Sequence, residues 1–85
     1  MSFVMALPTE KQFYVKNGPV LVSGTAFRKA LEKKEISKES FEFHIKNGDF
    51  TKWVEEVLLE PLLAKKISKL KSQSGILKKI KEHIK

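Results

Sequence analysis

The sequence predicts a small single-domain helical bundle of about four to five helices that also carries one short β-hairpin. Three observations lead to this mainly α fold class. At 85 residues the chain has room for one small domain only. Residues that favour β-strands gather near the start, on both sides of an Asn-Gly turn. After them, apolar residues recur with helical spacing almost to the last residue.

The first part of the chain contains a lead-in segment and the hairpin. Residues 1–11 are of mixed character, and we expect them to be loosely held, although Phe3, Val4 and Met5 could dock on the body. Residues 12–16 and 20–22 are the two predicted strands, and residues 17–19 (Asn-Gly-Pro) form the turn between them. Because an isolated two-stranded hairpin is marginally stable, we expect it to pack on helices.

The first helix is predicted over residues 26–34. Residues 23–25 (Ser-Gly-Thr) offer N-caps at its start. Phe27, Ala30 and Leu31 recur at i, i+3 and i+4, which places them on one helical face.

The next segment, residues 38–46, is compatible with two structures. Phe41, Phe43 and Ile45 alternate as in a strand, whereas Phe41, His44 and Ile45 match one face of a helix. We favour the helix, because Ser37 can cap its start and residues 47–48 (Asn-Gly) are typical of a helix end.

The clearest helical pattern follows residue 48. We expect Asp49 to be the N-cap of this helix. Five apolar residues at i, i+3, i+4, i+7 and i+8 predict one buried face: Phe50, Trp53, Val54, Val57 and Leu58.

Two further helical patterns complete the bundle. Pro61 suits the first position of a helix whose apolar stripe is Leu63, Ile67 and Leu70. Residues 72–75 (Ser-Gln-Ser-Gly) are expected to form a break or hinge. Beyond it the helical pattern continues with Leu77, Ile80 and Ile84. The predicted organisation is a lead-in segment (1–11), a compact strand-plus-helices domain (12–71) and a basic C-terminal helix (72–85).

The positive charge is confined to the end of the chain. The formal net charge is +7, yet residues 1–60 hold nine basic and nine acidic side chains. Residues 61–85 hold eight lysines and a single acid, Glu82. A surface with charge of one sign favours a polyanion or an acidic protein surface as the binding partner. The simpler interpretation is that these lysines only keep exposed helix faces in contact with water.

The basic segment supplies the candidate nucleic-acid contacts. Lysine acts as a point charge, so we expect contacts to phosphates that depend strongly on salt and read little sequence. Either DNA or RNA would satisfy this chemistry. The predicted contact residues are Lys65, Lys66, Lys69, Lys71, Lys78, Lys79 and Lys81.

No reactive constellation is visible, so we predict a binding protein without enzymatic activity. The absence of cysteine excludes disulfides, thiolate metal sites and a thiol nucleophile. His44 and His83 are the only histidines, and His44 fits a core position better than a ligand position. We therefore expect no catalytic residues, no metal, no cofactor and no small-molecule substrate. Phe13, Tyr14 and Trp53 fit core positions, the alternative being a base-stacking platform of exposed rings.

Membrane association is not expected. No apolar run approaches the roughly 20 residues that span a bilayer. The first eight residues lack the basic and apolar regions of a signal peptide, and the basic helices lack the aromatic residues typical of membrane-surface helices. We therefore expect a cytoplasmic protein.

Three runs of sequence resemble an uncharacterised domain family of archaea and bacteria. The first is 13–18 (Phe-Tyr-Val-Lys-Asn-Gly). The second is 41–45, which contains a Phe, a His and an Ile. The third is 48–58, which starts with Gly-Asp-Phe and contains a Trp-Val pair. The similarity covers roughly residues 12–70 and includes the Leu-Ala-x-x-Ile pattern of residues 63–67. The chain departs from it at Gly48, where that family often has Asn, and in its basic extension. The resemblance implies only a fold, a short hairpin or strand with a helical bundle.

In size, lysine content and absence of catalytic groups, the chain also resembles the small non-catalytic subunits of crenarchaeal B-family replicative DNA polymerases. That resemblance implies a heterotrimeric polymerase in which this chain docks on the large catalytic subunit and supports its assembly and DNA retention. The alternatives are a stand-alone, sequence-independent DNA- or RNA-coating protein and a toxin-like or regulatory binding module. The neutral first sixty residues favour the subunit, because they leave a large surface for a protein partner.

Overall fold

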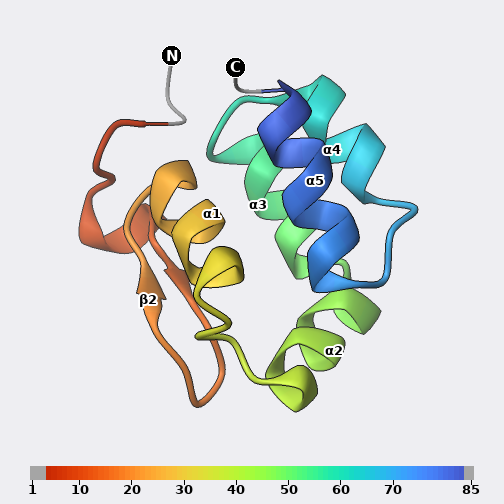
Figure 1. Ribbon diagram of the computed structural model, residues 1–85. Helices are drawn as coiled ribbons and strands as arrows, with labels where there is room; N and C mark the ends of the chain where they lie inside the picture. Colours follow the sequence, from red (N-terminus) through yellow and green to blue (C-terminus); the bar gives the residue numbers. More distant parts are fainter. Residues whose placement is uncertain (1–3, 84–85) are drawn as a thin grey trace.

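Helices and one antiparallel hairpin make up the computed structural model, which describes residues 4–83 (Figure 1). The mainly helical fold class with a short hairpin is confirmed. Phe3 and the last two residues of the predicted C-terminal helix, Ile84 and Lys85, lie outside the described residues. In chain order the elements are η1 (Thr9–Lys11), β1 (Phe13–Tyr14), β2 (Val20–Leu21), α1 (Gly24–Glu32), α2 (Lys38–Asn47), α3 (Asp49–Glu56), α4 (Pro61–Ile67) and α5 (Gln73–His83).

The hairpin is shorter than predicted, with two residues in each strand. Phe13 pairs with Leu21 and Tyr14 with Val20, so the first pair faces the core and the second faces solvent. Asn17 occupies the turn with φ 55°, a left-handed conformation that asparagine tolerates well. The backbone N–H of Leu7 donates to the carbonyl of Val22 at 2.8 Å, which ties part of the lead-in segment to the hairpin.

The first two helices begin at residues that the sequence indicates, and α2 also ends at one, whereas α1 ends at Glu32, two residues before its predicted end. Ser23 Oγ accepts from the backbone N–H of Ala26, and α1 therefore begins two residues before the predicted start. Ser37 Oγ accepts from the backbone N–H of Ser40, and Gly48 ends α2 with φ 71°. Residues 38–47 are thus helical, as favoured over the strand.

Three local expectations are wrong. Gly48, not Asp49, is the N-cap of α3, and Asp49 is its first residue. Val57 is only half-buried, because α3 ends at Glu56 and the chain turns there. The break before the last helix spans residues 68–72, because the Ser72 hydroxyl accepts from the Gly75 N–H and so starts α5 earlier than predicted.

The core is built around Phe50, with rings packed on it from three other elements. Its ring centroid lies 4.7 Å from that of Phe13 (β1), 5.0 Å from Phe27 (α1) and 5.7 Å from Phe41 (α2). The last helix joins the same core, since Ile76 and Ile80 of α5 are fully buried. The hairpin and α1 therefore lie on one side of the molecule and α4 with α5 on the other (Figure 1).

Candidate nucleic-acid interface

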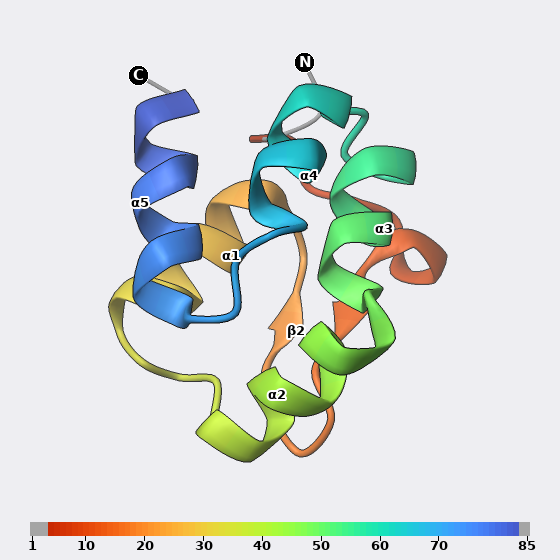
Figure 2. The ribbon, with the colours of Figure 1, turned by 90° about the vertical axis from the view of Figure 1, so that its right-hand side faces the viewer.

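The seven candidate lysines lie on α4, α5 and the loop between them. Figure 2 shows these three segments together on the face turned to the viewer, with the hairpin behind them. Pro61 occupies the first turn of α4. Leu63, Ala64 and Ile67 of α4 are buried, which turns Lys65 and Lys66 outward. Burial of Ile76 and Ile80 does the same for Lys78 and Lys81 on α5.

Two of the seven lysines are already engaged with carboxylates. Lys79 Nζ lies 3.6 Å from Glu82 on the same helix, and Lys81 Nζ lies 3.2 Å from Glu32 on α1. Within residues 4–83 the other five form no ion pair and are exposed: Lys65, Lys66, Lys69, Lys71 and Lys78. These five are the cations best placed to meet phosphates, since no carboxylate competes for them.

A shallow hollow of about 440 Å³ opens beside α5. Leu77 and Ser74 line it together with Lys78, Lys81 and Glu82. An apolar side chain between two lysines can contact the sugar or base part of a nucleotide while the ammonium groups meet phosphate. The hollow is open to solvent, so it can hold part of an extended chain and does not enclose a small molecule.

Phe13, Tyr14 and Trp53 do not form a base-stacking platform. Phe13 and Trp53 are buried, and the Trp53 Nε1–H donates to the carbonyl of Lys11 at 2.9 Å. Tyr14 alone of the three is exposed, and its hydroxyl donates to the carbonyl of Thr9. The core interpretation therefore holds for two of the three rings.

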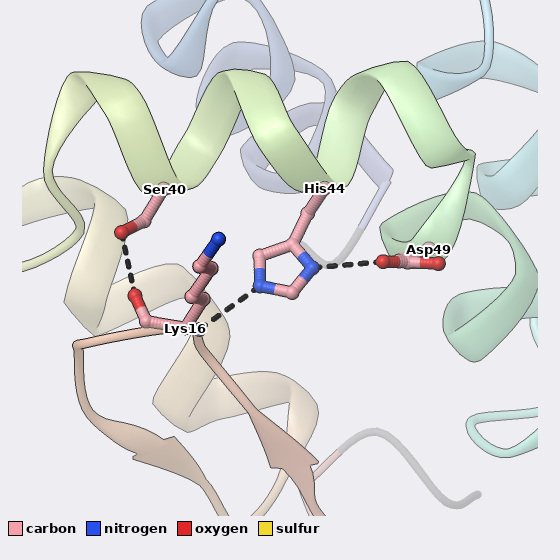
Figure 3. A network of polar contacts seen from close by, with 4 residues as sticks. All are labelled: Lys16, Ser40, His44 and Asp49. Carbon is pink, nitrogen blue, oxygen red and sulfur yellow. Dashed lines mark hydrogen bonds and ion pairs between the residues drawn. The ribbon is translucent and has the colours of Figure 1, made fainter.

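His44 lies at the centre of a polar network that sequence reasoning missed (Figure 3). The backbone N–H of Lys16 donates to His44 Nε2 at 3.0 Å, and the His44 ring packs edge-on against Phe13 at 4.8 Å. Because Nε2 accepts, the neutral ring carries its proton on Nδ1, from which it donates to Asp49 Oδ2 at 2.8 Å. Ser40 Oγ donates to the carbonyl of Lys16, so α2 holds both backbone groups of that residue.

This network has a structural role. A general base needs a free lone pair that can reach substrate, and the Nε2 lone pair of His44 already accepts from the protein backbone. The expectation of a core histidine is confirmed, since His44 is 6 % exposed with both ring nitrogens hydrogen-bonded. A signal for it was present in the spacing of His44 and Asp49 around the Gly48 helix end, but the Lys16 partner lies 28 residues away.

His83 is the second histidine with an unforeseen partner. Its Nε2 lies 3.1 Å from Glu60 Oε1, and both side chains are largely buried. The contact joins the last turn of α5 to the residue that precedes α4. It fixes the two basic helices relative to each other.

A metal-binding cluster and a membrane-spanning helix are both absent from the described part of the chain. Residues 4–83 contain no group of three or more His, Cys, Asp or Glu side chains arranged to hold a metal ion. No helix in the same range has the length and apolar character needed to cross a bilayer.

Comparisons with protein-family models, with curated proteins and with solved structures find no match for this chain. The two family resemblances therefore stay predictions.

Proposed function

We propose that this chain is a non-catalytic subunit of a large DNA-processing enzyme, with a replicative DNA polymerase as the first choice. In this role it binds DNA phosphates through the lysines of α4, α5 and their connecting loop, and it supports assembly of the enzyme and retention on DNA. The observation that carries the proposal is the gathering of exposed, unpaired lysines on one side of a structure whose first sixty residues are neutral.

The chemistry of these lysines favours backbone contacts over base reading. Five of them form no ion pair within residues 4–83, and each presents a single point charge on a long flexible stem. Such groups neutralise phosphates and release counterions, but they do not distinguish one base edge from another. Binding by this surface suits a protein that must hold DNA of any sequence.

The division of charge also suits a subunit. Residues 1–60 carry no net charge as a whole, so a protein partner can dock beside the lysine surface without meeting a second excess of positive charge. A standard specific interface needs roughly 800 Å² from each partner, which a domain of this size can offer. Docking would raise the effective concentration of the lysines at DNA to about the millimolar range.

The lysine surface is tested by the salt dependence of DNA binding. With five phosphates neutralised, we expect log K against log salt concentration to have a slope of about −4 to −5, measured by fluorescence anisotropy on duplexes of two unrelated sequences. Replacing Lys65, Lys66, Lys69, Lys71 and Lys78 by Gln should flatten this slope almost completely. Substitution is preferable to truncation, because α5 contributes buried side chains to the core.

A matched control separates a local surface from net charge. Replacing Lys11, Lys29, Lys33, Lys38 and Lys46 by Gln removes the same charge from exposed positions outside the basic segment. This variant should keep most of the slope. Equal loss in both variants would show that net charge alone drives binding, and the proposed surface would then be wrong.

A further inference from the structure

The connection between α3 and α4 exposes two leucines that the folded chain does not use. Leu59 is 67 % exposed and Leu62 is 69 % exposed, the two highest values among the large apolar side chains of residues 4–83. Isolated exposed leucines are common on protein surfaces, but these two lie within four residues of each other at the connection between α3 and α4. The described N-terminal segment, with exposed Val4 and Met5, lies at the same end of the molecule (Figures 1 and 2).

The backbone at this corner is strained in a way that displays the leucine. Leu59 has φ 56°, a left-handed conformation that glycine adopts freely and that costs a leucine free energy. Neighbouring hydrogen bonds hold it there, since the N–H of Glu60 donates to the carbonyl of Val54 and that of Leu58 to the carbonyl of Trp53. Within the monomer, no burial of the Leu59 side chain offsets the free energy that this left-handed backbone conformation costs.

The surface of α4 next to Leu62 is basic, whereas Glu55 and Glu56 at the end of α3 are acidic and exposed. Leu62, Lys65 and Lys66 follow one another at i, i+3 and i+4 on the outer face of α4, and both lysines are exposed without an ion pair in the described range. The nearest acid in sequence, Glu60, is occupied by His83. An apolar patch beside unpaired lysines is complementary to a partner that carries apolar side chains flanked by carboxylates.

We infer that the Leu59–Leu62 corner with Lys65 and Lys66 is the docking surface for an acidic amphipathic helix of the protein partner. The inference rests on the proposed function, in that it names the face by which the subunit attaches. Leucines of the partner helix pack on Leu59 and Leu62, and its glutamates or aspartates pair with the two lysines. Lys65 and Lys66 can meet phosphates only in the isolated chain, and in the complex Lys69, Lys71 and Lys78 stay available for DNA.

The charge at the corner disfavours a second copy of the chain as the occupant. A two-fold dimer would bring the patch against itself and set Lys65 and Lys66 of one protomer against the same lysines of the other. Duplex DNA is also a poor occupant, because its phosphates gain nothing from the leucines. An anionic membrane has the same sign of charge as the acidic helix and can also bury leucines, so vesicle binding is measured as a separate outcome.

The test is an NMR titration of the full chain with a synthetic helical peptide of about 15 residues, leucines at i, i+3, i+4 and i+7 and glutamates on the flanks. We expect shift changes centred on residues 59–66 and a dissociation constant on the order of 100 µM, since the patch is small. A scrambled peptide of the same composition should bind much more weakly. Equal binding of both peptides would overturn the inference.

Two variants and two matched controls locate the contact. Leu59→Gly and Leu62→Ser should each weaken peptide binding by about ten-fold or more, because each removes the burial of one leucine. Leu59→Gly should also raise the melting temperature by several degrees, since glycine relieves the strain. Lys34→Gly relieves the same conformation (φ 56°) at the end of α1, and Phe43→Ser removes an exposed apolar side chain from α2. Neither control should weaken peptide binding.

The remaining outcomes each overturn the docking surface. Peptide binding that survives Leu62→Ser would place the contact elsewhere. Self-association that Leu62→Ser abolishes would make the corner a dimer interface. Binding to phosphatidylglycerol vesicles that needs both leucines, without peptide binding, would assign the corner to a lipid surface. The DNA salt slope, measured on the same variants, reports separately on the lysine surface, so failure of one proposal does not imply failure of the other.

Discussion

Single residues decide where the elements of this small protein begin and end. Ser23, Ser37 and Gly48 could be identified from sequence because their effect is local: a hydroxyl accepts from a backbone N–H three residues on, and glycine accepts a positive φ. Lys34 and Leu59 could not, since neither residue type favours the left-handed conformation that it adopts. At these two positions the packing of the flanking helices overrides the local preference.

The side chain with the largest expected effect on stability is Trp53. It is 6 % exposed, its ring packs edge-on against Phe13 at 5.4 Å, and its indole N–H bonds the Lys11 carbonyl. We expect Trp53→Ala to reduce the free energy of unfolding by about 3 to 5 kcal/mol, measured by urea denaturation. Domains of this size are stabilised by roughly 4 to 13 kcal/mol in total, so the variant should lose a large share of its stability. A variant that unfolds at the same urea concentration as the native chain would contradict the packing described here.

Among the elements, α2 both covers the core and anchors the turn of the hairpin. His44 and Ser40 bind the N–H and the carbonyl of Lys16 (Figure 3). The helical spacing of His44 was apparent in the sequence, but its partner was not, because no local pattern connects residues 28 positions apart. Similarly, residues 73–75 look like a loop in sequence. They are helical because Ile76 is buried and Gln73 Nε2 donates to the carbonyl of Ile36.

Removing the imidazole should loosen the hairpin from the helices. We expect His44→Leu to lower the free energy of unfolding by roughly 1 to 3 kcal/mol, because the Lys16 N–H loses its acceptor. Asp49→Asn is the matched change on the other side of the ring, and it should cost less, since the amide oxygen can still accept from Nδ1–H at a half-exposed site. Chemical denaturation of both variants measures the difference. A larger loss in Asp49→Asn than in His44→Leu would contradict the assignment of this junction's stability to the bond between His44 and the Lys16 N–H.

For the whole molecule, the sequence predicts the fold class and the side on which charge accumulates, because both follow from amphipathic patterns within single helices. It does not predict which lysines are paired, since the partner of Lys81 is Glu32 on α1, far away in sequence. Nor does it indicate that the basic C-terminal helix shares the core of the other four.

The proposed assembly is tested with the intact chain and the catalytic subunit of a crenarchaeal B-family DNA polymerase. We expect the two proteins to elute together in size-exclusion chromatography at moderate salt, because docking on the Leu59–Leu62 corner does not depend on charge alone. Primer extension should continue further per binding event when the small chain is present, since its lysines add phosphate contacts. Leu62→Ser should abolish co-elution, whereas Phe43→Ser should not. Separate elution with unchanged extension would reject the polymerase as partner and favour a free nucleic-acid binder.

The bonds between α2 and Lys16 also bear on the order of events during folding. Strands of two residues cannot hold a hairpin together alone, and the groups that fix its turn come 24 and 28 residues later in the chain. Closing that loop costs entropy that only the assembled helices repay. We therefore expect the hairpin, although it comes first in the sequence, to reach its final structure only once α2 has formed.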